Sequence, residues 1–187
     1  MVTARMPAEP PPSSPHARDG RKVRSALPPV VWALGWVSLF TDAATDLIYP
    51  LLPAFLKSLG AGGGALGIVE GVAESVGAFV KWQAGSRSDR FARKKPFVVV
   101  GYAIATFVRP LLALAMAPWH VVLIRTVDRF GKGIRAAPRD AIVTSAVNPE
   151  NRAAAFAFHQ MMDNSGAVIG PLVAFVLTRV LNMELRS

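Results

Sequence analysis

The stretch GSRSDRFARKKPFVVVGYAIATFVRPLLALA, Gly85–Ala115, places a strongly basic segment directly before a long apolar one. The apolar part continues for about twenty residues, which is the length a helix needs to cross ~30 Å of hydrocarbon. The core of a soluble domain does not need apolar segments of that length. The stretch therefore predicts a loop at a membrane surface that is followed by a membrane-spanning helix.

The rest of the chain repeats this pattern. Hydrophobic residues make up 52% of the 187 positions and charged residues 18%, and the mean hydropathy of +0.36 is high for a soluble domain. The first 27 residues are rich in proline and charge, so we expect residues 1–27 to form a disordered cytoplasmic tail. The fold class predicted for residues 28–187 is an all-α, polytopic transmembrane helix bundle. Its expected spans are residues 29–56, 65–84, 96–117, 119–137 and 153–178.

Connections rich in lysine and arginine alternate with connections that contain few of these residues. The tail and the second connection are strongly basic, whereas the first connection holds only Lys57 and the third holds neither residue type. Cytoplasmic loops carry an excess of Lys and Arg, so we expect a multi-pass protein of the cytoplasmic membrane with a cytoplasmic N-terminus. Membrane topology then accounts for most of the net charge of +9, and nucleic acid is not an expected partner. Cysteine is absent, and we expect neither a metal nor a cofactor.

The basic loop resembles the signature of the major facilitator superfamily after its second span. That resemblance implies that the loop latches a cytoplasmic gate, with Asp89 facing the N-terminus of a helix in the partner half. The alternative is a plain basic loop that only sets topology. The matching residues are Gly85, Asp89, Arg90, Arg93, Lys94 and Lys95, while Ala92 stands where the signature has glycine.

Other stretches extend the resemblance from about residue 30 to residue 178. SLFTDAATDLIYPLLPAFL, GIVEGVAESVGAFVK and DRFGKGIRAAPRDAIV resemble one prokaryotic subgroup of the superfamily. Gly166, Gly170 and Pro171 resemble its fifth-span antiporter motif, although the same spacing also serves ordinary helix packing. The resemblance implies twelve spans in two halves, so we expect an incomplete N-terminal half that needs its missing C-terminal half or a partner chain.

Several charged residues fall inside the expected spans. Such groups are costly in a bilayer and usually face the bundle interior or a water-filled cavity. The resemblance implies that spans one and four line a central cavity, and the alternative is that these charges form structural ion pairs without touching substrate. The residues expected to bind substrate or a coupling ion are Asp42, Asp46, Arg125, Asp128, Arg129 and Asp163.

Two further expectations concern spans two to four. A rise of 1.5 Å per residue puts Glu74 and Arg109 at similar depth on consecutive helices, so we predict that they form a structural ion pair. Gly131, Gly133 and Pro138 are expected to loosen or end the fourth span as it emerges. The basic side chains Lys132, Arg135 and Arg139 would then lie at the cytoplasmic surface.

The resemblance implies secondary active transport by alternating access, coupled to a proton or another ion and without covalent catalysis. The expected partners are the lipid bilayer and a small-molecule or ion substrate whose identity the sequence does not indicate. The alternative is a truncated chain that transports nothing by itself, either as a remnant or as an accessory half-subunit.

Overall fold

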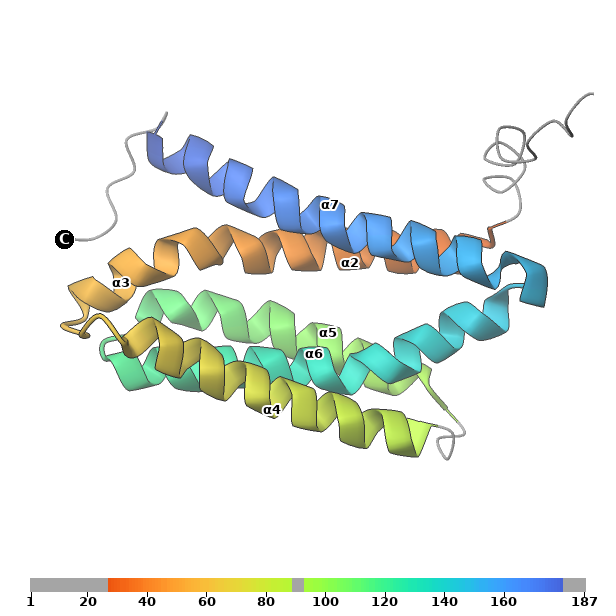
Figure 1. The fold of residues 1–187 in the computed structure, drawn as a ribbon, viewed down its shortest axis with the longest axis horizontal. Helices are drawn as coiled ribbons and strands as arrows, with labels where there is room; N and C mark the ends of the chain where they lie inside the picture. The colour runs from red at the N-terminus through yellow and green to blue at the C-terminus, as the bar shows by residue number, and fades with distance from the viewer. Residues whose placement is uncertain (1–26, 89–92, 180–187) are drawn as a thin grey trace, which may run out of the picture.

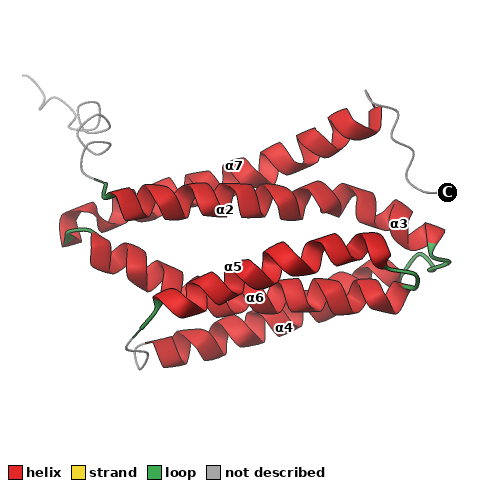
Figure 2. Cartoon of the chain, turned by 180° about the vertical axis from the view of Figure 1, so that it is seen from behind, coloured by secondary structure: helices red, strands yellow, loops and turns green. Residues whose placement is uncertain are grey.

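The computed structural model describes residues 27–88 and 93–179, and every regular element within these ranges is a helix (Figure 2). The predicted tail lies outside them except for Leu27, which packs in a small buried cluster. In chain order the elements are α2 (Pro29–Ile48), η2 (Tyr49–Leu51), α3 (Leu52–Ser58), α4 (Ala65–Ser88), α5 (Lys95–Val108), η3 (Arg109–Leu114), α6 (Pro118–Ala146), η4 (Pro149–Asn151) and α7 (Arg152–Arg179).

Proline marks where most of these helices begin. α2, α5 and α6 each have proline at their first or second position, where the missing backbone N–H would have no partner in any case. The helical segment that starts with α2 ends at Gly60, whose φ of +80° lies in the left-handed region that favours glycine. The chain then reverses direction into α4.

All five predicted spans are present as helices or as short runs of helices. The largest difference is in the fourth span, which was expected to end near residue 137, whereas α6 continues to Ala146. The expectation that Gly131, Gly133 and Pro138 end this helix was wrong, because the helix continues past all three, which are buried within it. Packing against neighbouring helices outweighs the local preference of these residues for a helix end.

The helices form two groups that lie side by side (Figure 1). α7 packs along α2, while α4 and α5 both pack against α6. The C-terminal part of α6 turns away from α4 toward α7, as proline within a helix allows (Figure 1). The start of α2 and the C-terminal ends of α4 and α6 lie at the same end of the bundle, as the alternating charge predicted.

Glycine pairs allow α6 to approach both of its neighbours closely. A Cβ added to Gly133 would lie 2.9 Å from the carbonyl oxygen of Gly77 on α4. A Cβ added to Gly131 would lie 3.0 Å from the carbonyl oxygen of Gly101 on α5. Close backbone approach through small residues is a common way for membrane helices to associate.

The predicted packing motif of the fifth span has the same role. A Cβ on Gly166 would lie 2.5 Å from the carbonyl oxygen of Leu39, and a Cβ on Gly170 would lie 2.5 Å from that of Ala43. Both glycines are buried against α2, whereas Pro171 is exposed within α7. The motif therefore sets the contact between α2 and α7.

The outer surface is apolar, as expected for helices in lipid. Large side chains such as Phe107, Leu114 and Trp82 are exposed. The segments Pro29–Ser58, Lys95–Leu114 and Pro149–Arg179 are long and apolar enough to cross a membrane by length and composition. α4 and α6 have the length but carry more charged residues, and those residues lie mainly between helices. The chain is an all-α transmembrane bundle with five helical spans.

Candidate functional site

Ion pairs join α4 to α6. Arg125, which is 2% exposed, donates from Nε and Nη2 to Oε1 of Glu70 at 2.9 and 2.7 Å. One turn further on, Arg129 Nη2 lies 2.9 Å from Oε1 of Glu74 and 3.6 Å from Oε2 of Glu70. These contacts help two highly charged helices fit within an apolar bundle, because Arg125 and Arg129 each have a carboxylate beside them.

The predicted pair between Glu74 and Arg109 is not formed. Arg109 Nε instead donates to Oδ1 of Asp128 at 2.9 Å, and its Nη1 donates to the carbonyl oxygen of Thr41 at 2.8 Å. Glu74 takes Arg129 as its partner. Depth along the axis was a poor guide because α4 and α5 both pack on α6, so the charged residues of α6 stand closest to each of them.

The residues of spans one and four that were predicted to line one cavity also have different partners from those expected. Arg125 and Arg129 turn toward α4 rather than toward Asp42 and Asp46 on α2. Asp42 Oδ1 lies 3.3 Å from Nζ of Lys132, a residue that was expected at the membrane surface. Asp46 is partly buried and has no Lys, Arg or His within ion-pair distance in the described part of the chain.

A polar network connects α6 and α7 with α2 and α5. Arg139 Nη1 lies 3.6 Å from Oδ2 of Asp163 and donates to Oγ of Ser38 at 3.2 Å. His159 Nδ1 lies 3.3 Å from Oδ1 of Asp163, and Ser38 Oγ lies 2.9 Å from the hydroxyl of Tyr102. The guanidinium of Arg139, a residue expected at the cytoplasmic surface, is held between helices by these partners.

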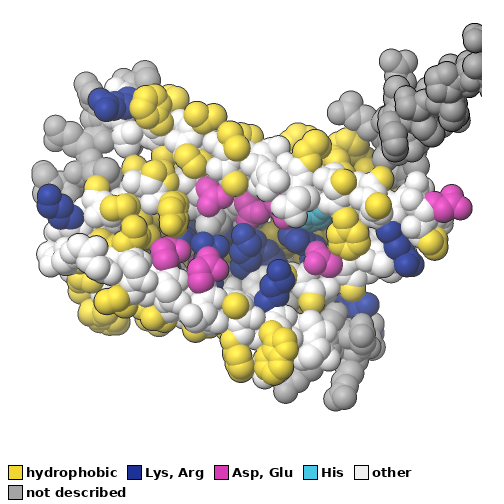
Figure 3. Space-filling view, viewed as in Figure 1, with side chains coloured by type: hydrophobic (Ala, Val, Ile, Leu, Met, Phe, Trp, Pro, Cys, Tyr) yellow, Lys and Arg dark blue, Asp and Glu magenta, His cyan; other side chains and the backbone are white. Residues whose placement is uncertain are grey.

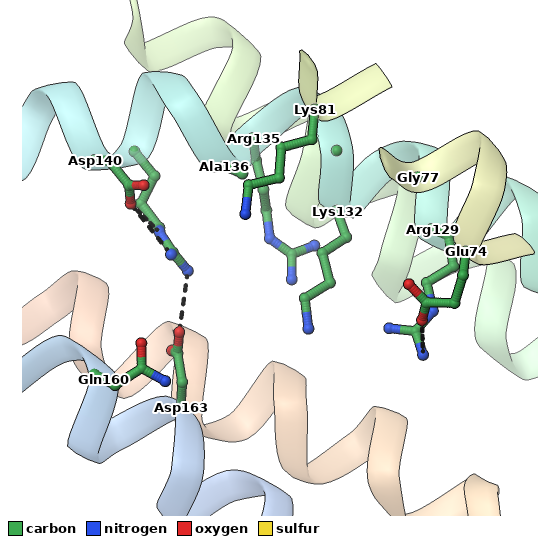
Figure 4. Close-up of a pocket in the computed structure, with 12 residues that line it drawn as sticks. Glu74, Gly77, Lys81, Arg129, Lys132, Arg135, Ala136, Asp140, Gln160 and Asp163 are labelled. Atoms are coloured by element: carbon green, nitrogen blue, oxygen red, sulfur yellow. Dashed lines mark hydrogen bonds and ion pairs between the residues drawn. The ribbon is translucent and has the colours of Figure 1, made fainter. Parts of the chain in front are cut away.

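A cavity of about 350 Å³ opens between α4, α6 and α7 (Figure 4). It lies in a band of charged side chains that crosses the middle of the molecule between apolar surfaces (Figure 3). Among the predicted site residues, Arg129 and Asp163 line it. The full lining is Glu74, Gly77, Lys81, Arg129, Lys132, Gly133, Arg135, Ala136, Arg139, Asp140, Gln160 and Asp163.

Four of the basic lining residues, Lys81 on α4 and three on α6, were missed as site residues by sequence reasoning, although the spacing of the three on α6 contained a signal. Lys132, Arg135 and Arg139 continue the spacing of three and four residues that begins at Arg125, so they share one face of α6. The signal extends past Arg129 only if the helix continues through Gly131, Gly133 and Pro138, as it does in the structure. Arg135 is 2% exposed, which also overturns its expected place at the surface.

The described residues of the predicted gate loop do not line this cavity. Gly85 is exposed near the end of α4, and a Cβ added there would meet no atom within 4 Å. Arg93 is exposed, and Lys94 precedes the first residue of α5. Asp89 and Arg90 lie outside the described residues.

Several proteins are similar to this chain. It is 32% identical over 146 residues to an uncharacterized MFS-type transporter of Methanocaldococcus jannaschii. The aligned region covers 78% of this chain and 36% of that protein. It is 32% identical over 142 residues to an uncharacterized protein of Mycobacterium tuberculosis, and the aligned region covers 76% of this chain and 35% of that protein. The multidrug resistance protein MdtH of Photorhabdus laumondii is 32% identical to this chain over 132 residues. The aligned region covers 68% of this chain and 32% of that protein.

The chain thus spans about a third of the length of the curated relatives it matches. The family model described as Major Facilitator Superfamily matches residues 34–184, which begins within α2 and covers the other described spans. The helix bundle, its apolar surface and its charged interior agree with that match. The chain belongs to the major facilitator superfamily.

Proposed function

We propose that this chain forms the N-terminal bundle of a secondary transporter that moves a small solute across the cytoplasmic membrane by alternating access. The observation that carries the proposal is the charged cavity between α4, α6 and α7 within an apolar bundle. Charged residues at membrane depth are costly, and in transporters they mark solute and ion pathways. Membrane transport as a general function follows from the family and from the MFS-type relative.

A second bundle should cover the charged face shown in Figure 3, and it is supplied either by a continuation of the chain or by a partner chain. The physical reason is that ionisable side chains open to lipid lack both water and counter-charges. The substrate and ion would then be enclosed between two bundles, as in alternating access. This arrangement makes the protein a carrier without covalent catalysis or a bound cofactor.

For coupling, we propose that Asp46 is the group that takes up a proton or another cation. Its carboxylate is partly buried, and no Lys, Arg or His of the described chain lies within ion-pair distance. Asp42, four residues earlier on the same face of α2, is already paired with Lys132. A carboxylate without a fixed counter-charge can exchange a cation during transport at lower cost than one that must first break an ion pair.

The proposed orientation places the N-terminus in the cytoplasm. The start of α2 lies at the same end of the bundle as the start of α5, next to the basic residues Arg93, Lys94 and Lys95 (Figure 1). Short loops that are rich in Lys and Arg remain on the cytoplasmic side. A tag at the N-terminus should be cleaved by protease only after the cytoplasmic face is made accessible.

Alternating access can be tested before any substrate is known. The 187 residues contain no cysteine, so a single Ala136→Cys change in the complete protein, freed of any other cysteine, puts one thiol on the cavity wall. Only a thiol that meets water forms the reactive thiolate. We expect a membrane-impermeant maleimide to label position 136 from either side of the membrane. Phe107→Cys, on the exposed apolar face of α5, is the matched control and should not be labelled.

Labelling at position 136 from one side alone, under all ion gradients, would contradict alternating access. Labelling of Phe107→Cys at the same rate would show that the assay reports leakage or unfolding instead. A protease-accessible N-terminal tag on intact cells would overturn the proposed orientation.

A further inference from the structure

Arg135 differs from the other basic residues in the second half of α6 and from Arg125 in having no carboxylate partner among the described residues. Its side chain is 2% exposed, and its Cζ lies 4.3 Å from the centre of the Tyr102 ring. Nη1 donates to the carbonyl oxygen of Gly101 at 3.5 Å, and the buried Nε has no hydrogen-bond partner within the described structure. The charge is therefore held by an aromatic face and one long hydrogen bond, and it borders the cavity.

Arg125 provides the comparison, because it is equally buried and lies on the same helix. Arg125 has Glu70 at 2.7 Å, whereas no carboxylate oxygen of the described residues lies within 4.0 Å of Arg135. A buried charge without a partner is costly, and a cation–π contact compensates for part of that cost only. A negatively charged ligand would supply the counter-charge that Arg135 lacks.

Lys81 and Lys132 extend toward the same space as Arg135 (Figure 4). Lys81, on α4, has no carboxylate within ion-pair distance among the described residues. Lys132 has Asp42 at 3.3 Å, but its side chain is 45% exposed and free to turn into the cavity. Three cations from two helices therefore surround one volume.

The carboxylates that line the cavity are already paired. Glu74 is bound to Arg129, while Asp140 and Asp163 both contact Arg139 (Figure 4). A cationic solute would have to displace an arginine to reach any of them. An anionic solute meets Arg135 and the two lysines without breaking an arginine–carboxylate pair.

We propose, on the basis of the transport function inferred above, that the solute is a small water-soluble anion whose carboxylate or phosphate group binds Arg135, with Lys81 and Lys132 beside it. The planar guanidinium matches the two oxygens of such a group. The cavity volume of about 350 Å³ is sufficient for a small metabolite-sized molecule.

A lipid headgroup has the same phosphate chemistry, but the cavity wall argues against it. No apolar side chain larger than alanine belongs to the described lining, so an acyl chain has no surface on which to pack. A free solute that is polar throughout fits this wall better. The two sources can be separated by the choice of lipid and probe.

The test measures the thermal stability of the complete protein in nanodiscs of zwitterionic phosphatidylcholine. Sodium succinate and inorganic phosphate are the probes, and sodium chloride at equal ionic strength is the reference. A ligand that binds the folded state raises the melting temperature in proportion to its occupancy. We expect at least one probe to stabilise the wild-type protein, and Arg135→Gln to weaken its apparent affinity by about tenfold or more. Arg152→Gln, an exposed arginine at the start of α7, is the matched control and should bind as the wild type does.

Lys81→Gln is a second variant in case Arg135→Gln fails to fold. Lys81 is exposed and has no ion-pair partner in the described ranges, so its replacement should leave the fold intact and still weaken the binding of the probe by several-fold. Stabilisation by neither probe, or equal stabilisation of the wild type and both variants, would overturn the proposal. Stabilisation by phosphatidylglycerol nanodiscs alone would also overturn it, because the ligand would then be a lipid.

The cysteine-labelling experiment makes failure of this inference distinct from failure of the transport proposal. Alternating labelling at position 136 without any effect of the anions would leave transport standing and remove the anion site. Anion binding that depends on Arg135, with labelling from one side alone, would leave the binding site standing and remove alternating access.

Discussion

Arg125 on α6 donates two hydrogen bonds to a single carboxylate oxygen of Glu70 on α4, at 2.9 and 2.7 Å. The guanidinium is 2% exposed and the Glu70 side chain 15% exposed, so both charges are largely removed from solvent. This contact is the most buried ion pair between α4 and α6 among the described residues. Glu70 is therefore the carboxylate that compensates the buried charge of Arg125.

Glu70→Leu should therefore destabilise the bundle by ~3–5 kcal/mol, because it leaves Arg125 buried without a counter-charge. Glu74→Leu is the matched control, since the Glu74 side chain is 60% exposed and its loss should cost less. Thermal unfolding in detergent micelles measures the difference. The double change Glu70→Leu with Arg125→Leu should recover most of the loss, and a double variant no more stable than Glu70→Leu would contradict this account.

Arg109 pairs with Asp128 instead of with Glu74, and this gives a second prediction. A double-mutant cycle between Arg109→Gln and Asp128→Asn should show a coupling energy of ~0.5–3 kcal/mol, because the two side chains are in contact. The cycle between Arg109→Gln and Glu74→Gln should show almost none. The free energy of unfolding of each single and double variant supplies both values. A larger coupling for Glu74 than for Asp128 would restore the pairing that helix depth suggested.

The crossing of α2 and α7 predicts how glycine substitutions differ. Gly166→Ala puts a Cβ 2.5 Å from the carbonyl oxygen of Leu39, so the helices must separate or shift, at a cost of ~1–3 kcal/mol. Gly71→Ala, on the exposed side of α4, meets no atom within 4 Å and should be neutral or slightly stabilising. Melting temperatures of the two variants test this. Equal melting temperatures would mean that α2 and α7 do not pack as closely as described.

Sequence reasoning located the spans well but not the partners of their charged residues. Span length follows from membrane thickness, and prolines such as Pro29 and Pro118 mark helix starts locally. The partners of Glu74 and Arg109 depend on how each helix is rotated and on which neighbour it contacts. Those contacts are set by glycine pairs such as Gly77 with Gly133, whose close approach no local pattern defines.

The course of α6 shows the same limit. Gly131, Gly133 and Pro138 favour a helix end when they are considered one by one. In the folded bundle they are buried, and the helix continues past them. Arg135, two residues after Gly133, is thereby carried to the wall of the cavity. Its role could be predicted from the spacing of the basic residues only if the helix were first assumed to continue.

The two aspartates of α2 should respond differently to neutralisation. Asp42→Asn removes the counter-charge of Lys132 and should lower the melting temperature. Asp46→Asn removes a partly buried carboxylate that has no ion-pair partner among the described residues, so it should leave the stability unchanged or raise it. Melting curves of the two variants at neutral pH provide the comparison. A loss for Asp46→Asn as large as that for Asp42→Asn would show that Asp46 has a structural partner, and it would remove the reason for proposing Asp46 as the coupling residue.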